Sequence, residues 1–182
     1  MADIKKKKEV PAAEEYIESV LNVRRIAKVI KGGRRFAFSA LVVVGDQNGR
    51  VGIALGKSRE VSSAISKALK RARKDMVAVP LYKTTIPYTV TGKHCASHVL
   101  IRSASKGTGV IAGGAVRAVM EAVGIKDVLA KSIGSENPQN VVKATIQALK
   151  KLKTAKEFAR LRGKEVEEII GKEKTEERNA TA

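Results

Sequence analysis

Two apolar patterns follow one another in the first half of the chain, and together they restrict its fold more than any other feature. The run 36–44 is rich in residues that favour β-strands, and a second such run at 50–55 follows a turn at 45–49. From residue 61 to residue 76 the apolar residues recur at helical spacing instead. This order predicts a β-hairpin covered by one amphipathic helix, which is a small two-layer α+β unit.

The segments around this unit carry weaker signals. Residues 16–30 hold closely spaced apolar side chains, but their periodicity leaves a helix and a strand both open. Ser62 or Ser63 can accept a hydrogen bond from a free amide of the first helical turn, so we expect one of them to be the N-cap. Pro80 breaks the helical pattern, and residues 79–82 are the expected linker to a second unit.

The second half of the chain predicts another unit that mixes strands and helices. A glycine-rich run at 107–114 precedes its first helix. The expected elements are a hairpin of 84–91 and 97–103 with Gly92 and Lys93 at its turn, a helix at 115–123 ended by Gly124, a strand at 128–133 and a helix opened by Pro138. This order is typical of an α+β or α/β domain.

Length and composition fit two small domains with charged ends. Of the 182 residues, 43% are hydrophobic, which is enough for a folded core. We expect a basic N-terminal arm at 1–15, a first domain at 16–81, a second domain at 82–153, and a charged, partly disordered extension at 154–182 with one short helix near 166–170. No apolar run approaches the roughly 20 residues that span a bilayer. With Cys95 as the only cysteine, the sequence predicts a cytoplasmic protein without a membrane partner.

Charge gives the strongest indication of function. The chain has 36 Lys and Arg against 18 Asp and Glu, a net charge of +18. Residues 19–45 contain no acidic residue, yet their basic residues flank the pair Gly32-Gly33. A segment of one sign must find its anions elsewhere, and a polyphosphate backbone supplies them. We therefore predict a nucleic-acid-binding loop, with an ordinary solvated turn as the alternative.

Two further features bear on how a nucleic acid is bound. The basic side of the predicted 61–76 helix is a plausible second phosphate contact, although such residues also serve solubility. Phe36 and Phe38 share a strand face, and we expect both in the core. With no Trp in the chain, we predict recognition of the backbone and grooves by Lys and Arg rather than base stacking.

The glycine-rich run at 107–114 permits an enzymatic interpretation. It could hold an anion at the start of the following helix, but it lacks the Gly-Lys-Ser/Thr ending of a phosphate-binding loop. Close packing or a partner surface that needs small residues is the favoured interpretation. His94, Cys95 and His98 are too few ligands for a closed zinc site, so we expect no metal, no cofactor and no catalytic residues.

Several longer runs resemble one family, that of the fifth protein of the bacterial small ribosomal subunit. The matching runs are Arg25-Ile-Ala-Lys-Val-Ile-Lys-Gly-Gly-Arg34, Val44-Gly-Asp-Gln-Asn-Gly-Arg-Val-Gly52, Ala104-Ser-Lys-Gly-Thr-Gly-Val-Ile-Ala-Gly-Gly114, Asp127-Val-Leu-Ala-Lys131 and Gly134-Ser-Glu-Asn-Pro-Gln-Asn-Val-Val142. They follow the family's order over roughly residues 16–170.

The resemblance implies an α+β chain with two domains. The first is similar to a double-stranded-RNA-binding fold, with a three-stranded sheet and one helix, and the second is a split β-α-β domain. It also implies a structural, non-enzymatic protein that binds small-subunit rRNA, contributes to subunit assembly and translational accuracy, and neighbours proteins four and eight. With proteins three and four it would line the place where mRNA enters the ribosome.

The predicted site residues form two sets. The RNA-binding set comprises Arg24, Arg25, Lys28, Lys31, Gly32, Gly33, Arg34, Arg35, Lys57, Lys67, Lys70, Arg71 and Lys74. The resemblance implies that a second set faces protein four, namely Gly107, Gly109, Gly113, Gly114 and Arg117. Two alternatives stay open, an enzyme that holds a phosphate ligand at 107–114 and a free-standing regulator that binds double-stranded RNA.

Overall fold

The first domain is a four-stranded antiparallel sheet with one helix on one face. The computed structural model describes residues 16–170, so the predicted arm at 1–15 and residues 171–182 of the predicted extension lie outside the described residues. The strands are β1 (Ile17–Ile30), β2 (Gly33–Gly45), β3 (Arg50–Ser58) and β4 (Val77–Ala78), in that spatial order. Of residues 16–30, all but the first thus form a strand, and the sheet has a short fourth strand beyond the three expected.

Helix α1 (Val61–Lys74) packs on this sheet through small side chains. Ala64, Ala68 and Ala72 are fully buried against the sheet. A Cβ on Gly56 of β3 would lie 2.1 Å from the Ala64 carbonyl oxygen, so the close approach requires glycine there. The helix is where the apolar spacing predicts it.

The predicted N-cap of α1 is wrong. Glu60 holds that position in an extended conformation, and its side chain makes no capping hydrogen bond. Because the first helical residue is Val61, Ser62 and Ser63 already lie inside the first turn. The Ser63 hydroxyl instead donates to the Glu60 carboxylate over 3.3 Å.

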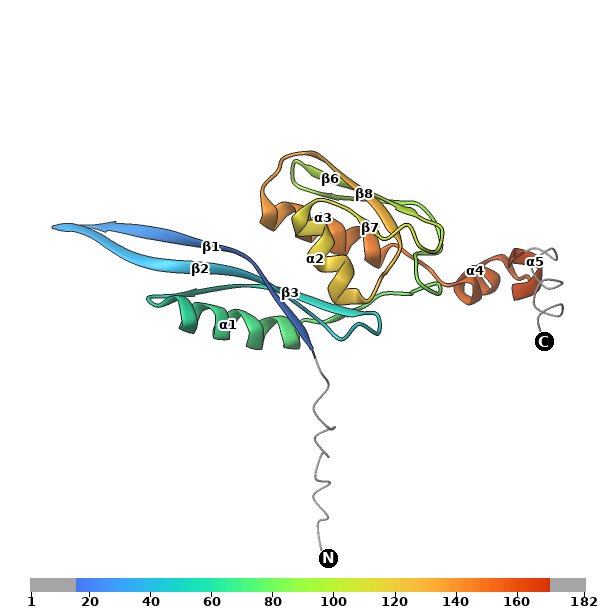
Figure 1. The fold of residues 1–182 in the computed structure, drawn as a ribbon, viewed down its shortest axis with the longest axis horizontal. Coiled ribbons are helices and arrows are strands. Elements are labelled where there is room, and N and C mark those ends of the chain that lie inside the picture. The colour runs from blue at the N-terminus through green and yellow to red at the C-terminus, as the bar shows by residue number, and fades with distance from the viewer. Residues whose placement is uncertain (1–15, 171–182) are drawn as a thin grey trace, which may run out of the picture.

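The second domain is another four-stranded sheet, with two helices on it (Figure 1). Its strands are β5 (Val90–His94), β6 (Ser97–Ser103), β7 (Val110–Ile111) and β8 (Val128–Gly134), in the spatial order β5-β6-β8-β7. Helix α2 (Gly114–Val123) connects β7 to the parallel strand β8, and α3 (Pro138–Lys150) follows. Gly124 ends α2 in a left-handed conformation and Pro138 begins α3, both as predicted.

The predicted turn of the second hairpin is misplaced. Gly92 and Lys93 lie inside β5, the turn falls at Cys95 and Ala96, and residues 84–89 are not a strand. The glycine at 92 serves packing, because a Cβ there would lie 2.0 Å from the Ala144 carbonyl oxygen in α3. A glycine that admits a helix onto a strand looks the same in sequence as a glycine that turns the chain.

Two short helices occupy the described part of the predicted extension. The helix expected near 166–170 is α5 (Val166–Ile170), whereas α4 (Ala155–Arg162) lies where no helix was expected. A capping box begins α4, in which the Thr154 hydroxyl accepts from the Glu157 amide and the Glu157 carboxylate accepts from the Thr154 amide. The Phe158 ring packs edge-on against Tyr88, with 5.8 Å between centroids, so α4 is attached to the second domain.

The two domains join where the β2–β3 turn meets the end of α2. The backbone amides of Gln47 and Gly49 donate to the carbonyl oxygens of Ala122 (3.1 Å) and Val123 (3.0 Å). These are C-terminal helix carbonyls that lack partners within their own helix. Val43 and Val51 of the first domain belong to the same buried apolar cluster as the core of the second domain, so the core is continuous across the junction.

The opposite end of the β1–β2 pair projects beyond the rest of the first domain and away from the second (Figure 1). We call residues 24–37 the projecting hairpin. Pairing of β2 with β3 stops at Phe38 and Ser58, whereas pairing with β1 continues to Gly33. From Ala37 to the tip, therefore, β1 is the only described strand beside β2.

Candidate nucleic-acid interface

The tip of the projecting hairpin is a tight turn made by the Gly-Gly pair. Ile30 pairs with Gly33, which leaves Lys31 and Gly32 as the turn. Gly32 has φ +92° and Gly33 has φ +145°, in the region that favours glycine. No described atom outside the immediate chain neighbours lies within 4 Å of where a Cβ would stand on either residue. Conformation, not packing, requires these glycines, and the backbone at the tip is open to an approaching molecule.

Cross-strand pairing divides the predicted cations of the hairpin between two faces. One face of the sheet packs on α1 through Ala40, Val42 and Val44, and we call it the helix face. The other face packs on the second domain through Val43, and we call it the domain face. From the register, the helix face carries Arg25 and Arg34, and the domain face carries Arg24, Lys28, Arg35 and, from β3, Lys57.

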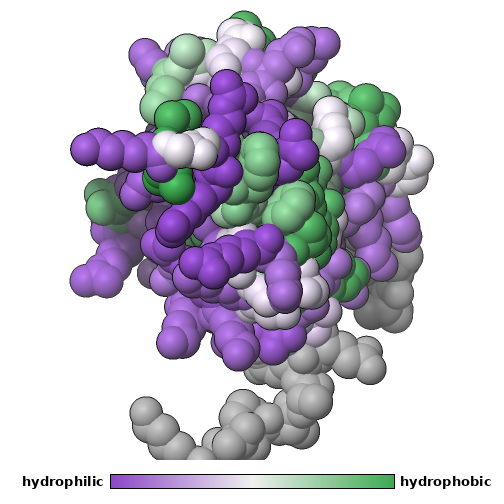
Figure 2. Space-filling view, turned by 90° about the vertical axis from the view of Figure 1, so that its left-hand side faces the viewer, coloured by the Kyte–Doolittle hydropathy of each residue, from purple (hydrophilic) through white to green (hydrophobic). Residues whose placement is uncertain are grey.

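Like charges stand directly opposite each other near the tip. Lys28 pairs with Arg35 across the two strands, an arrangement that is destabilising without counterions. Within residues 16–170, neither side chain has a carboxylate oxygen within 4.0 Å. Figure 2 views the molecule from this end and shows hydrophilic side chains over most of the surface. The hairpin therefore presents charge that the described chain does not neutralise.

Phe36 is not a core residue, contrary to the sequence-based expectation. Its side chain is 52% exposed, and the Arg25 guanidinium lies 4.7 Å from the centroid of its ring on the helix face. Phe36 lies beyond the part of β2 that β3 pairs with, so no third strand adjoins it. Phe38, two residues closer to the domain, is half-buried. The hairpin thus has an aromatic surface as well as charge.

The predicted cations of α1 share one flank of the helix. Lys67, Lys70, Arg71 and Lys74 follow the i, i+3, i+4, i+7 spacing that places side chains on one side. Arg71 forms an exposed ion pair with Asp75 at 3.7 Å. Lys67 and Arg71 face a hollow that Lys57 of β3 also lines, so this flank adjoins the domain face of the sheet.

The glycine-rich run is held in place by a residue that the site prediction omitted. Asp127 is buried, and one of its carboxylate oxygens accepts hydrogen bonds from the amides of Gly107 (2.9 Å) and Gly109 (3.0 Å). The hydrogen bond from the Gly109 amide lowers the pKa of this carboxyl most, and one from the Thr84 side chain lowers it next. Burial acts in the opposite direction, and the Gly107 and Thr108 amides lower the pKa further. Asp127 lies 18 and 20 residues from these partners, so no local spacing indicates its role.

The four glycines of this run are explained in two different ways. Gly107 and Gly109 have φ values of +92° and +76°, which their loop conformation requires. Gly113 and Gly114 have no positive φ, and in the described chain a Cβ on either would meet nothing within 4 Å. Close packing among the described residues therefore does not explain them. Arg117 donates to the Val110 carbonyl oxygen over 2.9 Å and closes the loop beside them.

The cysteine and histidine residues near the second hairpin turn do not converge. His94 Nδ1 lies 3.5 Å from the Gln147 amide nitrogen, and Cys95 is exposed. Within residues 16–170 no three His, Cys, Asp or Glu side chains form a group that could hold a metal ion. In the same range no helix is long and apolar enough to cross a membrane.

Comparisons with known proteins identify the family. A family model described as "Ribosomal protein S5, N-terminal domain" matches residues 16–80, and one described as "Ribosomal protein S5, C-terminal domain" matches residues 92–162. The "Small ribosomal subunit protein uS5" of Syntrophobacter fumaroxidans (strain DSM 10017 / MPOB) is 56% identical over 155 residues, which make up 85% of this chain and 93% of that protein. These matches confirm the α+β fold class and the resemblance to the small-subunit family. The chain belongs to the ribosomal protein S5 family, a family of structural proteins and not of enzymes.

Proposed function

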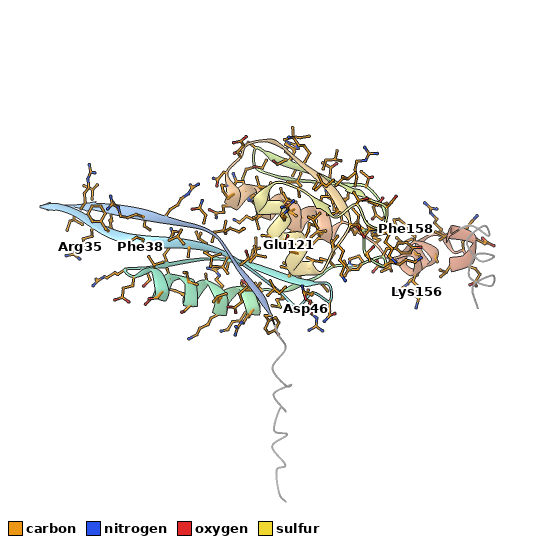
Figure 3. The ribbon with its side chains drawn as sticks, viewed as in Figure 1. Arg35, Phe38, Asp46, Glu121, Lys156 and Phe158 are labelled. Atoms are coloured by element: carbon orange, nitrogen blue, oxygen red, sulfur yellow. The ribbon has the colours of Figure 1, made fainter. Side chains whose placement is uncertain are left out.

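We propose that this protein is a cytoplasmic, structural component of the small ribosomal subunit that binds rRNA through the projecting hairpin and α1. The carrying observation is the hairpin itself, which projects from the body of the molecule (Figure 1) and whose basic side chains have no described carboxylate oxygen within 4.0 Å. Figure 3 shows Arg35 on this hairpin, far from Asp46 at the other end of β2. A polyphosphate relieves the repulsion between Lys28 and Arg35, which residues 16–170 leave uncompensated.

The exposed ring of Phe36 extends this proposal. Aromatic side chains beside cations are the usual platforms for unpaired bases. The Phe36 ring with Arg25 beside it is suited to such a base, and the remaining cations, Arg34 on the same face and Lys28 and Arg35 on the other, are suited to phosphates. Both kinds of contact then come from the first domain, proposed as residues 16–81.

We assign neighbouring ribosomal proteins to the second domain, proposed as residues 82–153. Gly113 and Gly114 leave the start of α2 without side chains, and no contact in the described chain requires glycine there. Ile111 beside them is 54% exposed. A partner that approaches the backbone closely accounts for both features. Protein four is the proposed partner at this surface, with proteins eight and three as further neighbours, and through them the chain contributes to subunit assembly, mRNA entrance and translational accuracy.

The rRNA contact is tested by a double substitution in the hairpin. Lys28→Ala with Arg34→Ala removes one cation from each face. The plot of log affinity against log salt concentration should therefore become less steep, by about 1.4–1.8 in slope. Lys93→Ala with Lys131→Ala, two exposed lysines on strands of the second domain, is the matched control and should leave the slope unchanged. Equal slopes for both double variants would refute this placement of the contacts.

The ribosomal assignment has a separate test that a free-standing RNA regulator would fail. In a cell lysate the tagged chain should sediment with small subunits. Recovery in light fractions, with unaltered affinity for duplex RNA, would favour the regulator instead.

A further inference from the structure

A groove separates the two domains beside the projecting hairpin. Two adjoining hollows, of about 200 and 500 Å³, lie between the domain face of the first sheet and the start of α3. Leu41, Leu55, Lys57 and Gln139 line both hollows. We treat them as one feature, the interdomain groove, whose larger part is within the size range of ligand sites in proteins.

The groove has an apolar floor and a basic rim. Leu41, Ile53 and Leu55 of the first sheet supply the floor. The cations on the lining come from both domains, and they are Arg24 of β1, Lys57 of β3, Lys67 and Arg71 of α1, and Lys143 of α3. Lys143 is half-buried and was not among the predicted RNA-binding residues.

The positive charge of the lining is mostly uncompensated. Asp75 is the one acidic residue of the described lining, and it pairs with Arg71 at 3.7 Å. In the described part of the chain, the other four cations have no carboxylate oxygen within 4.0 Å. A lining with five cations and one carboxylate favours a polyanion as the bound partner, rather than a neutral surface or one of mixed charge.

The groove continues the proposed RNA surface of the hairpin. Arg24 lines the groove and lies on the domain face that also carries Lys28 and Arg35. Arg24 and Lys28 lie four residues apart on β1, and Arg35 of β2 pairs directly with Lys28, so these cations form one path from the tip to the groove. An RNA strand bound along that face would enter the groove at Arg24.

We propose that the interdomain groove holds a single strand of RNA, which the cations of both domains bind at its phosphates and the apolar floor contacts at its sugars or bases. This inference rests on the proposed rRNA-binding function and deepens it. It gives the second domain a direct part in RNA binding through Lys143, in addition to its proposed protein partners. RNA in this groove contacts both domains at once and so favours the one relative placement seen here.

Lys143→Ala in the full chain is the test, with Lys150→Ala in the same helix as the matched control. Alanine suits a helix interior, and Lys150 is exposed at the end of α3 outside the groove lining. Loss of one phosphate contact should weaken binding to small-subunit rRNA about threefold or more and lower the salt slope by about 0.7–0.9. The Lys150→Ala chain should bind as the unmodified chain does, and unchanged thermal unfolding checks that both variants fold.

The outcomes separate this inference from the proposed function. If Lys143→Ala binds like Lys150→Ala while the hairpin double variant is weakened, the groove inference is wrong and the rRNA-binding function stands. If none of these variants weakens binding, both fail.

A photo-crosslinking residue at Gln139, which lines both hollows, identifies the occupant in assembled small subunits. A crosslink to rRNA supports the proposal. A crosslink to protein alone, or no crosslink, overturns it.

Discussion

The two ends of strand β2 contrast in how the chain uses glycine and charge. At the projecting end, a Cβ added to Gly32 or Gly33 of the turn would meet no described atom within 4 Å. At the other end, a Cβ on Gly45 would lie 2.0 Å from the Ala122 carbonyl oxygen, and the Asp46 carboxylate accepts hydrogen bonds from the amides of Asn48 and Arg50. One turn is completed within the protein, and the other is left for a partner. Substitutions in the turn after Gly45 should therefore alter stability, and substitutions in the turn at Gly32 and Gly33 should alter binding.

The largest expected effect is on folding, from Gly45→Ala. The added methyl group collides with helix backbone, which cannot move aside as a side chain can. We expect the free energy of unfolding to fall by about 3 kcal/mol, measured by urea denaturation. A wild-type unfolding midpoint in this variant would show that the junction is not tightly packed.

A pH-dependent loss is expected from Asp127→Asn. The pKa of Asp127 is lowered in the folded chain, chiefly by the Gly109 amide, so its stabilisation is present above the ordinary value of 3.8 and is lost as pH falls through the folded pKa. The unfolding midpoints of the two chains should differ at neutral pH and converge below pH 3.8. A gap of constant size across this range would contradict the role of the carboxylate.

At the projecting end, Phe36→Ala should act on binding alone. Loss of one stacked base weakens rRNA binding by about 1–3 kcal/mol. Because no charge is removed, the salt slope should stay that of the unmodified chain. Titration at several salt concentrations separates this result from that of the Lys28 and Arg34 double variant. A changed slope, or wild-type affinity, would argue against stacking at Phe36.

The smallest effect on stability is expected from Gly113→Ala, where an added Cβ meets no described atom. The unfolding free energy should change by less than about 0.5 kcal/mol. Binding to purified protein four, followed by calorimetry, should nevertheless weaken. Undiminished binding would remove the support for a protein partner at this surface.

The elements that could be predicted from sequence are those that local patterns define. The hairpin of β2 and β3, helix α1, the end of α2 at Gly124 and the start of α3 at Pro138 all follow from spacing and turn residues. A local signal for α4 also exists, because Thr154 and Glu157 have the spacing of a capping box.

The errors arose where tertiary contacts override local chemistry. Gly92 resembles a turn residue, yet it lies in β5 because α3 packs against its backbone. Phe36 resembles a core residue, yet the strand continues beyond the rest of its sheet. Asp127 bonds to the glycine-rich run, and Lys143 shares a hollow with residues of the first domain, both distant in sequence. A single sequence read on its own carries no signal of such pairings.

Directed hydroxyl-radical cleavage from the two ends of β2 tests the central claim most directly. An iron chelate is attached at Lys31→Cys in the projecting turn or at Asn48→Cys in the docked turn, both exposed. Cys95 is first replaced by Asn, which tolerates the positive φ of 51° at that position. In assembled small subunits the Lys31 position should cut rRNA more strongly than the Asn48 position. Equal cleavage from both positions, or none from Lys31, would contradict an rRNA-binding hairpin.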